Sequence, residues 1–157
     1  MDTSFKMILI AHRGNTEGPR PEKENHPRYI DRAIDLGYDV EVDIWGSFDT
    51  KLFLGHDEPQ FQIPPEWIFE RAHKLWVHAK DLPALFTFSQ QTVGIRAFWH
   101  QEDRYTLTTN GLLWTYPGAI LTPKSICVMP EKVPEVYTEG DLKNCAGICS
   151  DFISEYK

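Results

Sequence analysis

The sequence has few cysteines and no cysteine motif. Its three cysteines, Cys127, Cys145 and Cys149, are odd in number, and none of them forms a C-x-x-C pair. A disulfide framework needs paired cysteines and a structural zinc site needs closely spaced ligands, so the sequence argues against both. We expect all three thiols to be reduced and semi-buried.

Long apolar runs and an excess of basic charge are also missing. The first apolar run, Met7 to Ala11, is too short for a secretion signal or a membrane span. We therefore expect a cytoplasmic protein without membrane insertion. Sixteen basic against 23 acidic residues give a net charge of -7. This charge argues against general nucleic-acid binding and leaves room only for a local basic pocket that holds one anion.

The composition is sufficient for one globular domain over residues 1–157. Hydrophobic residues make up 41% of the chain, with five Trp, nine Phe and six Tyr. These large side chains can build a core without disulfides or structural metals.

Short apolar runs alternate with helical segments along the chain. The runs span residues 6–11, 38–45, 52–54, 75–79, 95–99, 112–115, 126–129 and 146–149. Helical patterns span residues 26–36, 64–72 and 82–91. This alternation predicts an α/β fold with a parallel sheet, in which polar residues gather at the carboxyl ends of the strands.

The fold class that we predict is a compact (β/α)8 TIM-type barrel in which several outer helices are reduced or missing. A full barrel takes about 250 residues, whereas eight units here would have roughly 20 residues each. Asn110-Gly111 fits either a hairpin turn or the end of a short helical turn. We favour the helical turn, because the strand order otherwise reads as parallel.

Glu41 and Asp43 lie two positions apart on one predicted strand, so both side chains point to the same face. Two carboxylates facing a barrel interior are costly unless a cation lies between them. Oxygen ligands suit Mg²⁺ or Ca²⁺, so we expect a divalent metal ion as cofactor. The alternative is an exposed edge strand whose acids are solvated.

Two histidines follow strands on either side of this acidic pair. His12 precedes Arg13, and His56 precedes Asp57. Histidine exchanges protons near neutral pH, and arginine can hold two phosphate oxygens at once. The pattern suits an acid/base pair flanking a phosphodiester, and the alternative is two ordinary hydrogen-bonded histidines.

Together these residues resemble the glycerophosphodiester phosphodiesterase family, within the phosphatidylinositol-phospholipase-C-like phosphodiesterases. The resemblance covers about residues 7–57 and rests on Ala11-His12-Arg13-Gly14, Glu24-Asn25, residues 37–43 and Gly55-His56-Asp57. It implies a (β/α)8 barrel and metal-dependent cleavage of a small-molecule phosphodiester. By resemblance, His12 and His56 are the catalytic acid/base pair, Glu41 and Asp43 bind the metal, Arg13 holds phosphate and Glu24 supports the site.

The resemblance resumes at residues 76–80, where the family shows Glu-x-Lys and this chain has His78-Ala79-Lys80. It implies that Lys80 binds phosphate and that His78 replaces the glutamate that would be the third metal ligand. Imidazole favours softer ions than Ca²⁺. The alternative is that His78 binds nothing and that Glu102 or Glu131 completes the site.

Later strand ends carry further candidates. Trp114-Thr115 resembles a late strand of the family, and residues 146–151 resemble its last strand. Trp114, as a supporting residue, either stacks against a substrate sugar or glycerol or fills the barrel mouth. We expect residues 100–103 to line the pocket rather than to start a helix, Glu131 to be a solvated loop acid, and Asp151 to cap a helix.

The predicted function is therefore metal-dependent hydrolysis of a glycerophosphodiester-like substrate. One alternative is a lyase on the same fold that forms a cyclic phosphate, and another is a non-catalytic module that binds a phosphorylated ligand. Thin helical cover would expose apolar outer strand faces, which a homodimer could bury.

Overall fold

The computed structural model describes residues 6–90 and 94–157 as strands and helices in alternation. The strands are β1 (Ile8–His12), β2 (Asp39–Gly46), β3 (Leu52–Leu54), β4 (Phe61–Ile63), β5 (Leu75–Ala79), β6 (Arg96–Phe98), β7 (Tyr105–Leu107), β8 (Leu113–Thr115), β9 (Ser125–Val128) and β10 (Gly147–Ser150). The helices are α1 (Pro27–Asp35), α2 (Pro65–Arg71), α3 (Leu82–Ser89) and α4 (Glu139–Lys143), with 3-10 turns η1 (Pro130–Lys132) and η2 (Ile153–Tyr156). None of the helices in these ranges is long and apolar enough to cross a membrane.

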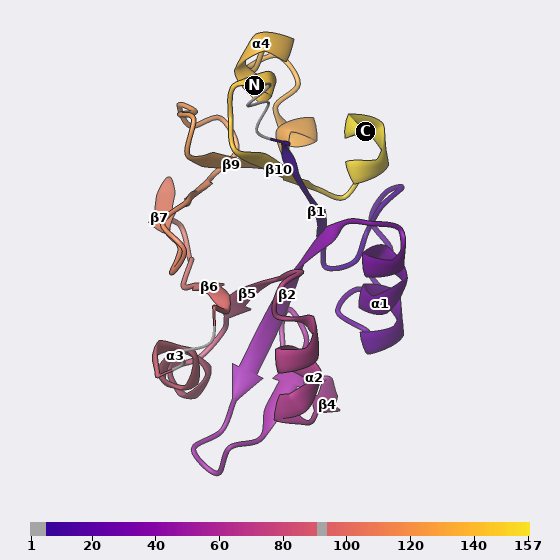
Figure 1. The fold of residues 1–157 in the computed structure, drawn as a ribbon, viewed down its shortest axis with the longest axis vertical. Coiled ribbons are helices and arrows are strands. Elements are labelled where there is room, and N and C mark those ends of the chain that lie inside the picture. The colour runs from indigo at the N-terminus through magenta and orange to yellow at the C-terminus, as the bar shows by residue number, and fades with distance from the viewer. Residues whose placement is uncertain (1–5, 91–93) are drawn as a thin grey trace.

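All the strands belong to one mixed, mostly parallel sheet. Neighbours run in the order β6-β5-β2-β1-β10-β9-β8-β7, and β3 and β4 continue from β2 as an antiparallel hairpin. Every pair from β6 round to β8 is parallel. Figure 1 shows these strands around a ring with the helices outside it. The structure is thus mixed α/β, with helices after β1, β4, β5 and β9.

The ring is not closed by strand pairing. Within residues 6–90 and 94–157, no ladder joins β6 to β7 or β8. The two ends of the sheet meet instead through the Thr109 amide, which donates to the Ala97 carbonyl at 2.9 Å, and through Phe98, whose ring stacks on Trp114 at 4.4 Å. The (β/α)8 barrel therefore stays a prediction.

The expectation of a helical turn at Asn110-Gly111 is wrong. These residues lie in a turn between β7 and β8, which pair antiparallel, so the hairpin alternative holds. The Thr108 amide donates to the Leu112 carbonyl at 2.9 Å, and Gly111 adopts a φ of +81° that suits a glycine. Strands β4 and β7 were not expected, because each has three residues and carries little apolar pattern. The predicted helix 82–91 ends at Ser89, and Gln91 lies outside the described residues.

The apolar core has two layers that follow from strand alternation. A larger cluster contains the side chains between the sheet and the helices. A smaller cluster contains the inward side chains Ile10, Trp76, Phe98, Trp114, Ile126 and Cys149. Because side chains alternate along a strand, the residue two positions after each of these also faces inward, one layer nearer the carboxyl ends. Those residues are His12, His78, His100, Tyr116, Val128 and Asp151.

The opposite end of the ring is held by a partly buried ionic network around Asp39. Its Oδ2 accepts hydrogen bonds from Trp76 Nε1 at 3.0 Å and Arg96 Nη1 at 2.7 Å, and Lys74 Nζ lies 3.2 Å from Oδ1. The Arg96 guanidinium also lies 4.6 Å from the Trp76 ring centre. This network ties β2 to β5 and β6 beneath the apolar layer.

Replacing Asp39 by alanine should therefore lower the free energy of unfolding by about 2 kcal/mol, because Arg96 and the Trp76 N–H lose a charged, partly buried partner. Urea denaturation followed by tryptophan fluorescence measures this loss. Asp49→Ala is the control, because it breaks an exposed ion pair with Lys51 that contributes little. Equal stability of the two variants would contradict a structural role for the network.

Candidate active site

The carboxyl ends of the strands surround a cavity of about 400 Å³. Its lining includes eight residues that the sequence points to: His12, Arg13, Glu41, Asp43, His56, His78, Lys80 and Trp114. Glu24, the remaining predicted site residue, lines an adjoining cavity of about 330 Å³ that shares His12, Arg13 and His56 with the first. The structure thus brings the predicted residues together in one place.

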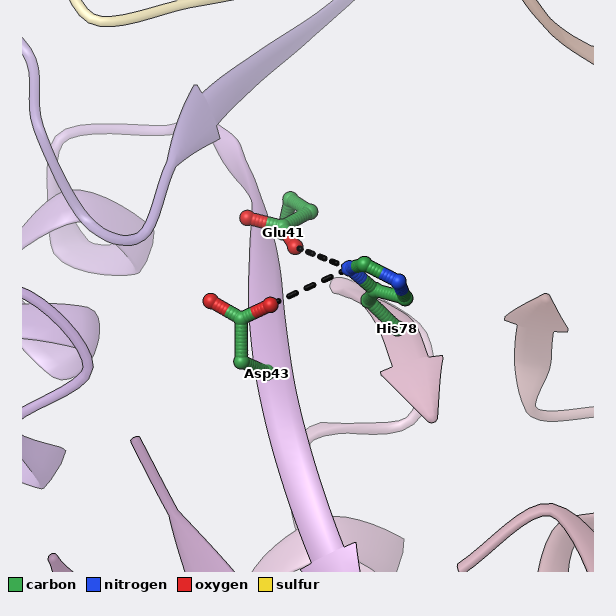
Figure 2. Close-up of side chains that lie close together, drawn as sticks. All are labelled: Glu41, Asp43 and His78. Atoms are coloured by element: carbon green, nitrogen blue, oxygen red, sulfur yellow. Dashed lines mark ion pairs between the residues drawn. The ribbon is translucent and has the colours of Figure 1, made fainter. Parts of the chain in front are cut away.

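A cluster of three possible metal ligands lies on two neighbouring strands. Glu41 and Asp43 project from β2, and His78 on β5 stands opposite Asp43 in the parallel register. Figure 2 shows the His78 ring facing both carboxylates, with Nδ1 at 3.1 Å from Asp43 Oδ1 and 3.8 Å from Glu41 Oε1. The ligand atoms of all three lie within 4.8 Å of one another. Glu41 and Asp43 are 2% and 1% exposed, so the alternative of solvated edge acids is wrong.

The tautomer of His78 shows that this cluster suits a cation. His78 Nε2 lies 2.9 Å from the His100 carbonyl oxygen, which can only accept, so Nε2 carries a hydrogen. In a neutral ring the lone pair on Nδ1 then points at the two carboxylates. The buried Asp43 Oδ1 has no hydrogen-bond partner among the described residues. Three acceptors that converge in this way fit a divalent ion, and a backbone carbonyl on the far nitrogen is typical of metal-binding histidines.

The alternative metal ligands lie elsewhere. Glu102 is exposed and does not line the cavity. Glu131 accepts hydrogen bonds at its Oε1 from Ser150 Oγ at 2.9 Å and from the Asp151 amide at 3.0 Å. The expectation that Glu131 is a solvated loop acid is therefore wrong, because it holds the end of β10.

Two basic side chains offset the buried acids. Arg13 Nε lies 3.4 Å from Asp43 Oδ2, and Lys80 Nζ lies 3.6 Å from Asp43 Oδ1. Burial alone would raise the pKa of Asp43, but a protonated His78, which can donate from Nδ1 when no cation is bound, and the charges of Arg13 and Lys80 hold it well below its ordinary value. Burial and the neighbouring Asp43 charge raise the pKa of Glu41. A cation beside Glu41 would offset both the burial of its carboxylate and the repulsion from Asp43.

The loop after β1 positions Arg13 and Asp43. Arg13 adopts a left-handed φ of +54°, which is held by the hydrogen bond that its backbone amide donates to the Glu41 carbonyl at 3.0 Å. Its side-chain Nη1 donates to Glu24 Oε2 at 3.0 Å. Asn25 donates to Asp43 Oδ2 at 2.8 Å and accepts from the Asp43 amide at 3.0 Å. Glu24 is thus a supporting residue of the site. Asn25 is a second supporting residue, which belongs to the Glu24-Asn25 motif but had no predicted role.

His12 is oriented by a carboxylate that the sequence reading missed. Its Nδ1 lies 2.7 Å from Asp151 Oδ1, and its Nε2 lies 3.8 Å from Glu41 Oε2. Asp151 also accepts from Asn15 Nδ2 at 2.8 Å. The expectation that Asp151 caps a helix is therefore wrong. Burial lowers the pKa of His12, but the Asp151 hydrogen bond and the Glu41 charge more than offset this and raise the pKa above its ordinary value.

His56 stands at the other side of the cavity in a different environment. Its side chain is 38% exposed, and its Nδ1 lies 2.6 Å from Asp57 Oδ1. Burial, and next the nearby Arg13 charge, lower the pKa of His56. Gly55 permits this placement, because a Cβ there would lie 2.0 Å from the Glu58 carbonyl oxygen. The two histidines therefore have pKa values shifted in opposite directions, which is the pattern of an acid and a base.

The wall across the cavity from these groups is aromatic. Trp114 is 4% exposed and packs on Phe98 and Trp76, so it fills the interior beneath the cavity. Tyr116, two positions further along, is 48% exposed and also lines the cavity. Of residues 100–103, His100 and Gln101 line it, whereas Glu102 and Asp103 do not. The expected pocket lining is thus confirmed for the first two.

Comparisons with protein-family models, with curated proteins and with solved structures found no match to this chain. The resemblance to glycerophosphodiester phosphodiesterases therefore stays a prediction.

The cluster should bind one divalent ion, and His78→Ala should weaken that binding about 100-fold, because an imidazole ligand is lost. Isothermal titration calorimetry with Mg²⁺, Ca²⁺, Mn²⁺ and Zn²⁺ measures the affinities. The matched control is His73→Ala, an exposed histidine just before β5. Failure of the wild-type protein to bind any of the four ions would contradict the metal site.

Proposed function

We propose that this protein is a metal-dependent phosphodiesterase that hydrolyses a small-molecule, glycerophosphodiester-like substrate. The observation that carries the proposal is one cavity in which two histidines with opposite pKa shifts flank a buried Glu–Asp–His cluster and an arginine. The order of these residues along the chain, which resembles that family, supports the same function.

Arg13 and Lys80 are placed to bind the phosphate. Both line the cavity beside Asp43, and the Arg13 guanidinium has donors left after its contacts with Glu24 and Asp43. A divalent ion held by Glu41, Asp43 and His78 would neutralise phosphate charge and lower the pKa of a hydroxyl or water bound to it. These charges would stabilise the negative charge that develops on the phosphoryl oxygens.

The two histidines divide the proton transfers. His56, whose pKa is lowered, is suited to remove the proton from the attacking hydroxyl or water. As the new P–O bond forms, the bond to the leaving alcohol breaks, and His12 at Nε2 gives that alcohol a proton. Asp151 holds the His12 Nδ1 hydrogen and so keeps Nε2 toward the cavity. If a neighbouring substrate hydroxyl attacks first, a cyclic phosphate forms, and water opens it with the histidine roles reversed.

The same residues would serve a lyase that stops at the cyclic phosphate. Reaction in isotopically labelled water separates the two, because only the hydrolase product carries a solvent oxygen. A binding module for a phosphorylated ligand has no use for the His12–Asp151 pair, so we place this third alternative last.

The wild-type protein should hydrolyse bis(p-nitrophenyl) phosphate or glycerophosphocholine, lose that activity with EDTA and regain it with one added divalent ion. His12→Ala and His56→Ala should each lower kcat at least about 100-fold, because each removes an acid or a base. His73→Ala serves again as control. Near wild-type turnover in either variant would remove that histidine from the mechanism.

Asp151→Asn tests the orientation of His12. Asp151 accepts from His12 Nδ1 and so keeps a hydrogen on that atom, whereas an asparagine amide can donate as well as accept and no longer fixes this tautomer. His12 Nε2 is then less often in the state that transfers a proton, and we expect kcat to fall about 1000-fold. KM should change less than kcat, because Asp151 lines the adjoining cavity but is engaged there by His12 and Asn15. Steady-state kinetics measure both constants. A rise in KM with unchanged kcat would show that Asp151 acts on binding instead.

A further inference from the structure

The mouth of the cavity is divided into two unlike halves. Inward side chains at the ends of β1, β2 and β5 are ionisable: His12, Asp43, His78 and Lys80. His100 and Tyr116, just beyond β6 and β8, and Val128, at the end of β9, line the cavity above the apolar layer of Phe98, Trp114 and Ile126. The ionisable half accounts for the phosphate and the metal, and the aromatic half has no role in the mechanism above.

We propose that the aromatic half is a subsite for a ring-bearing alcohol of the substrate, uncharged or anionic, with Tyr116 as the stacking residue. This inference rests on the proposed function and names the substrate class. The preferred substrate is a phosphodiester in which one alcohol presents a flat aromatic or sugar ring. A cationic amino alcohol is disfavoured at this position.

Trp99 and His100 also line this cavity and are partly exposed, but its most exposed aromatic side chain is that of Tyr116. It is 48% exposed, whereas Trp114 below it is 4% exposed and stacked on Phe98 at 4.4 Å. The His100 ring completes the wall at 5.8 Å from the Tyr116 ring centre, tilted by 34°. An exposed aromatic ring over a packed aromatic layer offers a flat apolar surface to a second ring.

The backbone of Tyr116 is fixed before a ligand arrives. Its amide donates to the Arg104 carbonyl at 2.9 Å, and its carbonyl accepts from the Ala119 amide at 3.1 Å. The turn that follows contains Gly118 at φ +85°. A side chain carried on a held backbone has less conformational entropy to lose when it stacks.

The charges that line this cavity disfavour a cationic group of the substrate. The acids that line this cavity among the described residues are Glu41 and Asp43, and both belong to the metal cluster. The basic lining residues are Arg13, Lys80 and Lys132. A choline or ethanolamine group over Tyr116 would therefore meet positive charge and no free carboxylate.

The adjoining cavity accommodates the second alcohol of the diester. It shares His12, Arg13 and His56 with the aromatic cavity, so a phosphate at these residues has one substituent in each. Its own lining contains Pro19, Pro21, Gln60 and Asp57 and lacks an aromatic ring apart from histidine. The ring is therefore assigned to the Tyr116 side.

Binding of phosphate monoesters tests the subsite without requiring turnover. Isothermal titration calorimetry, with and without Mg²⁺, compares phenyl phosphate, ethyl phosphate, phosphocholine and inorganic phosphate. We expect phenyl phosphate to bind about tenfold more tightly than ethyl phosphate, the size of one ring stacking on an aromatic side chain. Tyr116→Ala should remove this difference and Tyr116→Phe should keep it. Tyr105→Ala is the matched control, since Tyr105 on β7 is 43% exposed but outside the cavity.

Several results would overturn the subsite. These are equal binding of phenyl and ethyl phosphate, tighter binding of phosphocholine than of phenyl phosphate, an equal loss in Tyr105→Ala, or no binding of any probe. The ring preference without cleavage of any diester would overturn the proposed hydrolysis and support the subsite. Cleavage of diesters without the ring preference would do the reverse.

Discussion

Two carboxylates buried next to each other, Glu41 and Asp43, are the constraint on which the rest of the site depends. Removing even one carboxylate from water costs several kcal/mol, and a second like charge adds to that cost. The neighbouring contacts all act to offset it. Arg13 takes a left-handed backbone conformation while its amide contacts Glu41, Asn25 satisfies Asp43 from both its amide atoms, and Lys80 faces the same carboxylate. These contacts leave Glu41, Asp43 and His78 with ligand atoms within 4.8 Å of one another, close enough to hold a metal ion.

Strand alternation turns this local constraint into a site. Parallel strands that each bury one apolar residue place the residue two positions later one layer higher, at the same end of the sheet. In this chain those later residues are His12, His78, His100, Tyr116, Val128 and Asp151. The apolar layer below them is buried, with the rings of Trp76, Phe98 and Trp114 packed together. It both supports the polar residues and reduces the screening of their charges.

The parts of this arrangement that depend on local pattern could be read from the sequence. The period-two spacing of Glu41 and Asp43 and the polar residues after each apolar run are local features, and they predict the strands and the cavity lining. Asp151 could not be assigned, because its partner His12 lies 139 positions away and an aspartate after a strand looks like a helix cap. The hairpin at Asn110-Gly111 was misread for a similar reason, since only pairing with the short strand β7 distinguishes it from a helical turn. Closure of the ring depends on contacts between its two end strands, which no local pattern specifies.

His78 affects how this acidic chain could bind the phosphate of a substrate. The whole chain carries a net charge of -7, yet the phosphate is proposed to bind where Arg13 and Lys80 balance the carboxylates of Glu41 and Asp43. With a neutral imidazole as third ligand, the ligands of a divalent ion would carry two negative charges rather than three, so more positive charge would remain for an anionic ligand. A third carboxylate would cancel part of it and bind hard ions such as Ca²⁺ more readily, whereas imidazole shifts preference toward softer ions. In the proposed mechanism, His78 would therefore influence both the choice of metal and the strength of phosphate binding, through the Nδ1 atom that faces both carboxylates.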